Sequence, residues 1–181
     1  LKQMRREHVP VLLESLAAWL STEKETQRVA MLLESLSDFT PLEVRPLLEG
    51  ILQDKLHADA NRLTALAAWS GGLKPGDEPH LLRVAQALDE GQVLATLLRD
   101  LGTRDQVKSD LLLLEKLDSP VAVVRSAAID SLATRKNRDA ASHVVRLLDD
   151  PELVVRRSAA SAAGHLHVAA AVELLRTLVL S

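Results

Sequence analysis

Apolar residues recur at helical spacing along almost the whole chain. In residues 149–166, "DDPELVVRRSAASAAGHL", Val155, Ala159, Ala163 and Leu166 fall on one face of a helix. The same spacing predicts eleven helices and therefore an all-α fold. Their expected ranges are about 3–20, 23–38, 41–53, 59–70, 79–89, 92–101, 105–117, 120–134, 138–148, 151–165 and 168–180, with 69–79 as the longest irregular connection.

Helix boundaries are marked by residues that suit the free backbone groups at helix ends. In the stretch above, Asp150 (Ser119 in an earlier copy) is placed to cap a helix, and Pro151 suits its first position. Gly164 is expected to adopt the left-handed turn that ends this helix.

Earlier in the chain, two Thr-x-x-Glu pairs have the spacing of capping boxes. Thr40 with Glu43 predicts a helix start at residue 41, and Thr22 with Glu25 offers a second start. Pro46 is expected to kink or restart the 41–53 helix, because proline has no N–H to donate.

The segment that starts at residue 149 repeats an earlier one. When Pro151 is aligned with Pro120, the segment falls on "DSPVAVVRSAAIDSLA", residues 118–133, and a second shift of the same size finds a fainter copy. A fixed period of about 31 residues, in units too small to bury their own faces, is typical of a stacked solenoid.

We therefore expect a single α-α superhelix, a helical solenoid, over residues 1–181. Its repeats are degenerate over 1–86 and clearer over 87–117, 118–148 and 149–181. Because helix 168–180 is apolar where a terminal repeat is usually polar, we expect further repeats, a partner chain or self-association through it. Since the chain begins at Leu1, and its first helix has no partner, we expect a segment of a longer protein.

The two copies resemble HEAT-like repeats of the short bacterial type, first noted in phycobilin lyase subunits. The shared pattern is Asp-Pro, a few residues, Val-Arg, then Ala-Ala and Leu-Gly, and the resemblance is clear over residues 118–181. It implies an armadillo-type interaction scaffold and does not imply lyase activity.

The resemblance also implies a structural ladder of arginines between repeats. Carried over, Arg125 and Arg156 pair with acidic or carbonyl groups near Asp118 and Asp149. Ligand-facing arginines are the alternative. Leu94 occupies the corresponding place in the faint copy, so the ladder is expected to break there.

The amino-acid composition mainly excludes or disfavours classes of function. Aromatic residues make up 2% and the net charge is −3, which disfavours nucleic acid as a partner. Trp19 and Trp69 are expected to pack against neighbouring repeats rather than anchor a partner. With no cysteine, thiolate chemistry is excluded, and no apolar run is long enough for membrane insertion. The compartment stays open, with the cytoplasm favoured.

No catalytic or cofactor motif stands out, so we predict no enzyme activity, no cofactor and no metal site. "GGLKPG" (71–76) lacks the features of a phosphate-binding loop. His165 and His167 are two residues apart, so they do not share one face of a helix.

The candidate partner-binding residues are basic. Arg135, Lys136 and Arg138 lie in a predicted loop, where they form one edge together with Arg157. A solvated loop is the alternative interpretation.

The leading functional hypothesis is a non-catalytic scaffold that binds a protein or neighbouring domains of the same chain. Its alternatives are a nucleic-acid-binding HEAT-like solenoid that uses this basic edge, and an accessory subunit of a lyase-type enzyme.

Overall fold

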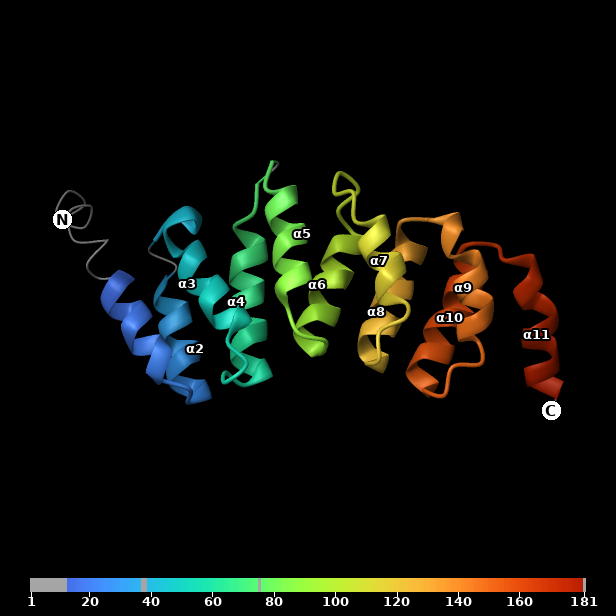
Figure 1. Cartoon of the computed structure of the whole chain (residues 1–181), viewed down its shortest axis with the longest axis horizontal. Coiled ribbons are helices and arrows are strands. Elements are labelled where there is room, and N and C mark those ends of the chain that lie inside the picture. The colour runs from blue at the N-terminus through green and yellow to red at the C-terminus, as the bar shows by residue number, and fades with distance from the viewer. Residues whose placement is uncertain (1–12, 37–38, 75, 181) are drawn as a thin grey trace. The chain divides into compact units, whose positions relative to one another are not determined.

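The computed structural model describes residues 13–36, 39–74 and 76–180, and every regular element in them is helical. The expected all-α class is confirmed (Figure 1). The chain divides into two compact units, with the division between Asp77 and Glu78. We call them unit 1 and unit 2. A single solenoid across this division stays a prediction.

Unit 1 contains helical residues 13–22, followed by α2 (Thr26–Ser35), α3 (Pro41–Gln53) and α4 (Asp59–Gly71). The start of α3 is as expected, because the N–H of Thr40 donates to the Glu43 carboxylate at 2.8 Å. Pro46 lies within α3 and does not restart it.

The second expected capping box is wrong. Thr22 lies at the end of the preceding helix, where its hydroxyl donates to the carbonyl of Trp19. Glu25 itself caps α2, and its carboxylate accepts from the N–H groups of Gln27 and Arg28. A long acidic side chain therefore performs the capping expected of the threonine.

Unit 2 begins with α5 (Glu78–Ala87), α6 (Gln92–Gly102) and α7 (Asp110–Lys116). It continues with α8 (Ala122–Thr134), the short 3-10 helix η2 (Arg138–Ala140) and α9 (Ala141–Leu147). The last two helices are α10 (Leu153–His165) and α11 (Ala169–Leu180). The largest departure from expectation is α7, which starts five residues after the predicted residue 105.

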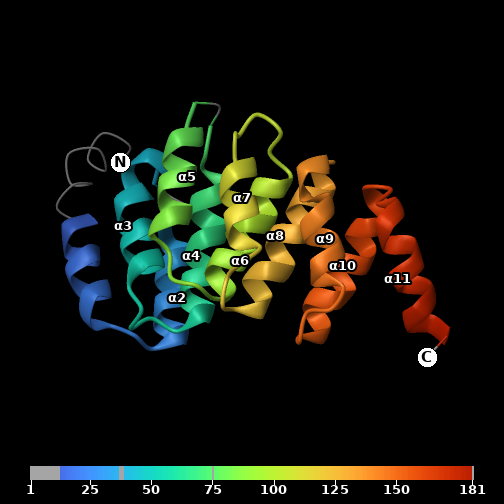
Figure 2. The same cartoon turned by 45° about the vertical axis from the view of Figure 1, so that its right-hand side comes forward.

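The first helices of the repeats, α6, α8 and α10, pack directly on one another in order (Figures 1 and 2). Small residues allow this approach: a Cβ on Gly102 of α6 would lie 2.8 Å from the Cα of Ser131 on α8. Between α8 and α10, the hydroxyls of Ser126 and Ser158 are 2.9 Å apart.

Both sides of α8 are therefore covered, and its buried residues do not form a single stripe. In contrast, α10 buries the expected face of Val155, Ala159, Ala163 and Leu166.

The expected helix ends in these repeats need two corrections. Pro120 and Pro151 lie outside α8 and α10, since the side chains of Ser119 and Asp150 bind the N–H groups of Val121 and Glu152. A local turn thus precedes each helix.

Gly164 does not supply the left-handed turn, because α10 continues through it to His165. The left-handed residues are Lys136 (φ 54°) and His167 (φ 53°), which lie one period apart. The N–H after each one bonds back five residues, Asn137 to the carbonyl of Leu132 and Val168 to that of Ala163.

Candidate functional site

Arg125 connects two repeats through a fully engaged guanidinium group. Its Nε and Nη2 donate to the two carboxylate oxygens of Asp150 at 2.9 and 2.8 Å. Its Nη1 donates to the carbonyl of Ser119, also at 2.8 Å. Both side chains of the ion pair are largely buried, with 12% of Arg125 and 6% of Asp150 exposed. We call this arrangement the Arg125 rung.

Burial and hydrogen bonding act in opposite directions on the pKa of Asp150. Burial alone would raise the pKa of its carboxyl group, but hydrogen bonds from Arg125 and the N–H of Glu152 outweigh it. The net effect holds the pKa below its usual value, so Asp150 is ionised and paired at neutral pH.

The two aspartates expected in the ladder lie beside it. Asp118 pairs with Arg146 at 2.5 Å in an exposed ion pair, and Asp149 is exposed. Asp150 takes the rung position because its bond to the N–H of Glu152 points the carboxylate toward Arg125. The contribution of the ladder to stability stays a prediction.

Arg156 repeats only half of the Arg125 arrangement. Its Nη1 donates to the carbonyls of Asp150 and Pro151, both at 2.8 Å, as Arg125 does to that of Ser119. Among the described residues, the structure gives no carboxylate partner for its Nε and Nη2, the atoms that grip Asp150 in Arg125.

The break expected at Leu94 is bridged by another polar contact. Leu94 is fully buried, and Glu90 accepts instead from Lys116 at 2.8 Å and from the Ser119 hydroxyl at 2.6 Å. Burial alone would raise the pKa of Glu90, but these two hydrogen bonds outweigh it and lower the pKa. In this Glu90 rung, the earlier repeat supplies both the acid and Lys116, and the later repeat supplies the Ser119 hydroxyl; in the Arg125 rung, the earlier repeat supplies the base and the later one the acid.

Arg135 differs from the expected solvated cation. Its side chain is 9% exposed, and its Nε donates to Asp110 at 2.6 Å. Its other nitrogens donate to the carbonyls of Leu101, Arg104 and Val107. Arg135 therefore holds residues 103–109 in an irregular loop, which also explains the late start of α7.

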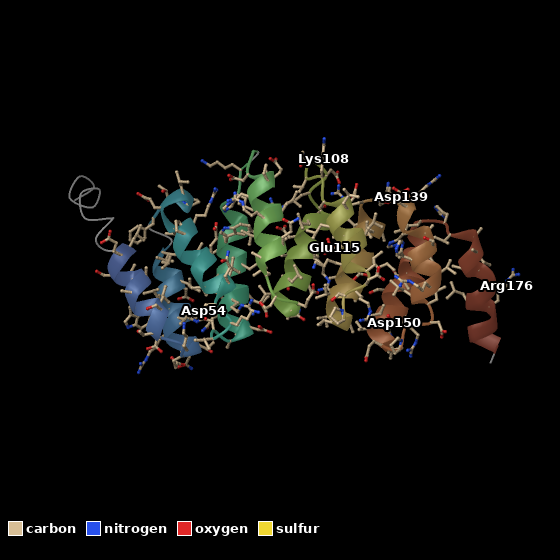
Figure 3. The ribbon with its side chains drawn as sticks, viewed as in Figure 1. Asp54, Lys108, Glu115, Asp139, Asp150 and Arg176 are labelled. Atoms are coloured by element: carbon tan, nitrogen blue, oxygen red, sulfur yellow. The ribbon has the colours of Figure 1, made fainter. Side chains whose placement is uncertain are left out.

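The other three basic candidates are exposed but do not form one edge. Lys136 and Arg138 follow the C-terminal end of α8, whereas Arg157 lies near the start of α10. Ser126, which meets Ser158 beside Arg157, lies eight residues before the end of α8 at Thr134, so the end of α8 that precedes Lys136 is about 12 Å further along the helix axis. In Figure 3, Asp139 and Asp150 mark these two opposite ends. Partner binding by these residues stays a prediction.

Beside Arg135 lies a shallow polar depression of about 450 Å³, lined by Asp105, Asp110, Thr134, Arg135, Lys136 and Asn137. Asp110 and Arg135 already bind each other there. The histidines noted earlier, His165 and His167, are both exposed. Within the described residues, no three His, Asp or Glu side chains lie together in a metal-binding group.

A partly buried polar cluster in unit 1 was not predicted. Lys24 lies 2.5 Å from Asp54 and 3.2 Å from the Nε2 of His57, whose other ring nitrogen is 3.4 Å from the Asn61 amide. Burial lowers the pKa of His57, and the charge of Lys24 lowers it further. Ser21, Asp54 and His57 line a cavity of about 180 Å³ next to this cluster. Lys24 lies 30 residues before Asp54, and the cluster follows no repeat, so no local pattern marks it.

The remaining expectations concern tryptophan packing and membranes. Trp69 is 2% exposed and donates to Glu49 at 2.9 Å, whereas Trp19 is 38% exposed. Of the expected C-terminal apolar surface, Glu173, Leu174 and residues 177–180 have side chains outside the described set. Among described residues, no helix has both the length and the apolar character needed to cross a bilayer.

Stacked helix pairs joined by repeated rungs define unit 2 as a helical-repeat structure of the α-solenoid class. Comparison with protein families agrees, because the family model of HEAT repeats matches residues 110–181. This segment contains the Arg125 rung and both copies of the Val-Arg motif. No curated protein matches the chain.

Proposed function

We propose that the protein is a non-catalytic scaffold that binds another protein through the HEAT-like part of unit 2. HEAT repeats generally serve as protein-interaction scaffolds, and such a repeat matches over residues 110–181. In this proposal the packed helices give shape, and an exposed row of side chains gives specificity.

The observation that carries the proposal is apolar exposure on the second helices of the repeats. Leu111 on α7 is 83% exposed and Val172 on α11 is 46% exposed. Leu114 and Val145, which lie one period apart, are half-buried on α7 and α9. We call these four residues the outer ridge. Apolar side chains that remain accessible on three second helices favour a protein partner, because burying them releases water.

Co-purification from the source lysate tests this proposal. We expect the wild-type chain to retain a protein partner that Leu111→Glu with Val145→Glu releases. A change of the same net charge away from the ridge, Lys136→Gln with Arg138→Gln, should leave the partner bound. Both double variants should unfold at close to the wild-type urea concentration, because none of the four substituted side chains is fully buried.

The opposite pattern would contradict the proposal. If the Lys136 and Arg138 changes release the partner, and binding weakens steeply with salt, the basic loop is the functional surface. Nucleic acid in the retained material would then identify the partner. This alternative uses Lys136 and Arg138 without Arg135, whose reversal would remove the bonds that hold the 103–109 loop.

A further inference from the structure

His57 lies buried at the point where two turns of unit 1 meet. It belongs to the turn between α3 and α4, whereas Lys24 belongs to the turn between helical residues 13–22 and α2. The Nε2 of the His57 ring is 3.2 Å from the ammonium nitrogen of Lys24, and its Nδ1 is 3.4 Å from the amide nitrogen of Asn61 on α4. The ring therefore links the 23–25 turn to the start of α4.

Both neighbours of the His57 ring are hydrogen-bond donors, because an ammonium group has no lone pair and an amide nitrogen only donates. In either neutral tautomer, one ring nitrogen can accept a hydrogen bond, from Lys24 or from Asn61. In the imidazolium form both ring nitrogens carry protons, so neither contact can be a hydrogen bond. A proton on the ring thus makes both contacts repulsive.

The surroundings of the ring oppose its protonation on balance. Burial lowers the pKa of His57 most, and the charges of Lys24 in the 23–25 turn and Arg62 on α4 lower it further. Asp54 at the end of α3, whose Oδ2 is 3.9 Å from Nε2, acts in the other direction, as does the backbone of Leu20. The pKa stays below 6.5, so the ring is neutral at pH 7 and gains its proton in mild acid.

Asn61 offers the protonated ring a different arrangement. Its Oδ1 is buried and has no hydrogen-bond partner among the described residues. Half a rotation of the amide would bring this oxygen to the Nδ1 proton of His57. The same rotation would remove the hydrogen bond, 3.3 Å long, from the Asn61 amide to the carbonyl of Lys24. Protonation therefore costs Lys24 its contacts with His57 and Asn61, and leaves its partly exposed ion pair with Asp54.

We propose that His57 is an acid-sensitive latch within unit 1. When its ring takes up a proton, the 23–25 turn separates from the start of α4, and the adjoining cavity between helical residues 13–22 and α3 opens. This cavity of about 180 Å³ is lined from its two sides by Leu20 and Ile51, each 2% exposed while the latch is closed. Acid thus exposes an apolar surface that is covered at neutral pH. The latch does not depend on the scaffold function proposed for unit 2.

Amide hydrogen exchange of the full chain between about pH 7 and pH 5 tests the latch. Protection factors remove the effect of pH on intrinsic exchange and give the opening equilibrium of each segment. Because one proton is taken up, opening of residues 20–29 should increase with falling pH, by at most about tenfold per pH unit. Residues 65–71 of α4 should keep their protection, because the latch releases a turn and does not unfold unit 1.

Lys24→Met gives the sharpest test, because it removes the ammonium group and leaves Asp54 beside the ring. The imidazolium should then pair with Asp54, so the pKa of His57, followed by NMR of its ring protons, should rise above the wild-type value. Opening of residues 20–29 should no longer increase with acid. His57→Gln identifies the ring signals and should also remove the acid response.

Lys55→Met is the matched control. Lys55 is exposed on the same turn as His57 and carries the same charge as Lys24, so this variant should keep the wild-type response.

An acid response in Lys24→Met equal to that of the wild type would overturn the proposal. Loss of protection in residues 65–71 together with residues 20–29 would also overturn it, because unit 1 would then unfold as a whole. A wild-type His57 pKa at or above 6.5 would be a third contrary result. None of these measurements involves partner binding, so failure here and failure of the scaffold proposal are separate results.

Discussion

Unit 1 and unit 2 are both built from helices, but they hold them together differently. Unit 2 uses related contacts in successive repeats: a polar rung before α8 and another before α10, and small residues where first helices cross. Unit 1 uses contacts that occur once, such as buried Arg62 donating to the Leu52 carbonyl. The difference shows that contacts repeated along the chain can be predicted from the sequence. Contacts that occur once can be equally specific, but no sequence pattern predicts them.

The largest effect should come from breaking the Arg125 rung of unit 2. Arg125→Ala should destabilise unit 2 by about 3–5 kcal/mol, because it leaves the carboxylate of Asp150 buried without its partner. Urea unfolding followed by circular dichroism measures the change. The control is Arg156→Ala, which should cost under about 1 kcal/mol. Equal losses from both would show that the rung carboxylate adds nothing.

Packing of the first helices should be the next most sensitive feature. Gly102→Ala should cost about 1–3 kcal/mol, since the new methyl group meets Ser131 at 2.8 Å. Gly164→Ala is the matched change, and should stabilise α10 by about 0.5 kcal/mol, because a Cβ there would meet no described atom within 4 Å and alanine favours helix. A destabilised Gly164→Ala chain would mean that this space is occupied.

Acidification should destabilise unit 1 before unit 2. Burial lowers the pKa of His57 in unit 1, so the unfolded chain binds its proton first and stability falls as the pH drops below about 6.5. In unit 2, hydrogen bonds depress the pKa of Glu90 and Asp150, so their contribution is lost only nearer about pH 4. Amide hydrogen exchange between about pH 7 and pH 5 should show unit 1 opening first. His57→Gln should remove this difference, and its persistence would assign the effect to other groups.

The smallest effect should come from the two left-handed helix ends of unit 2. Lys136→Gly and His167→Gly should each stabilise the chain by about 0.5 kcal/mol, because glycine adopts a positive φ without strain. The gain is limited by the greater freedom of glycine in the unfolded chain. Thermal unfolding with Asn137→Gly as a control, at a residue with negative φ, checks that the gain depends on conformation.

How far the sequence could predict the fold follows from the same contrast. Period and helical spacing located α8 and α10 to within two residues. The missed residues are Pro120 and Pro151, because Ser119 and Asp150 bind nearby N–H groups and delay each helix. Nothing local distinguishes a hydroxyl that caps a helix from one that closes a turn before it.

The candidate basic edge illustrates the limit for functional residues. Arg135, Lys136 and Arg138 are close in sequence, yet Arg135 turns inward toward three carbonyls of the preceding repeat, in and next to the 103–109 loop. That loop lies about one period earlier in the chain. No charge pattern in its sequence predicts that its carbonyls accept from Arg135. Arg125 was easier to interpret, because a second copy of its motif stands at Arg156.

The two units, divided after residue 77, also differ in their aromatic side chains and therefore in their fluorescence. Both tryptophans and the single phenylalanine lie in unit 1, and the sequence has no tyrosine, so unit 2 has none of these aromatic side chains. Trp69 is buried against Glu49 and should change its emission when unit 1 opens. Fluorescence will therefore report unit 1 alone, while circular dichroism reports both. If the two signals change at different urea concentrations in one sample, the units unfold separately, without any added label.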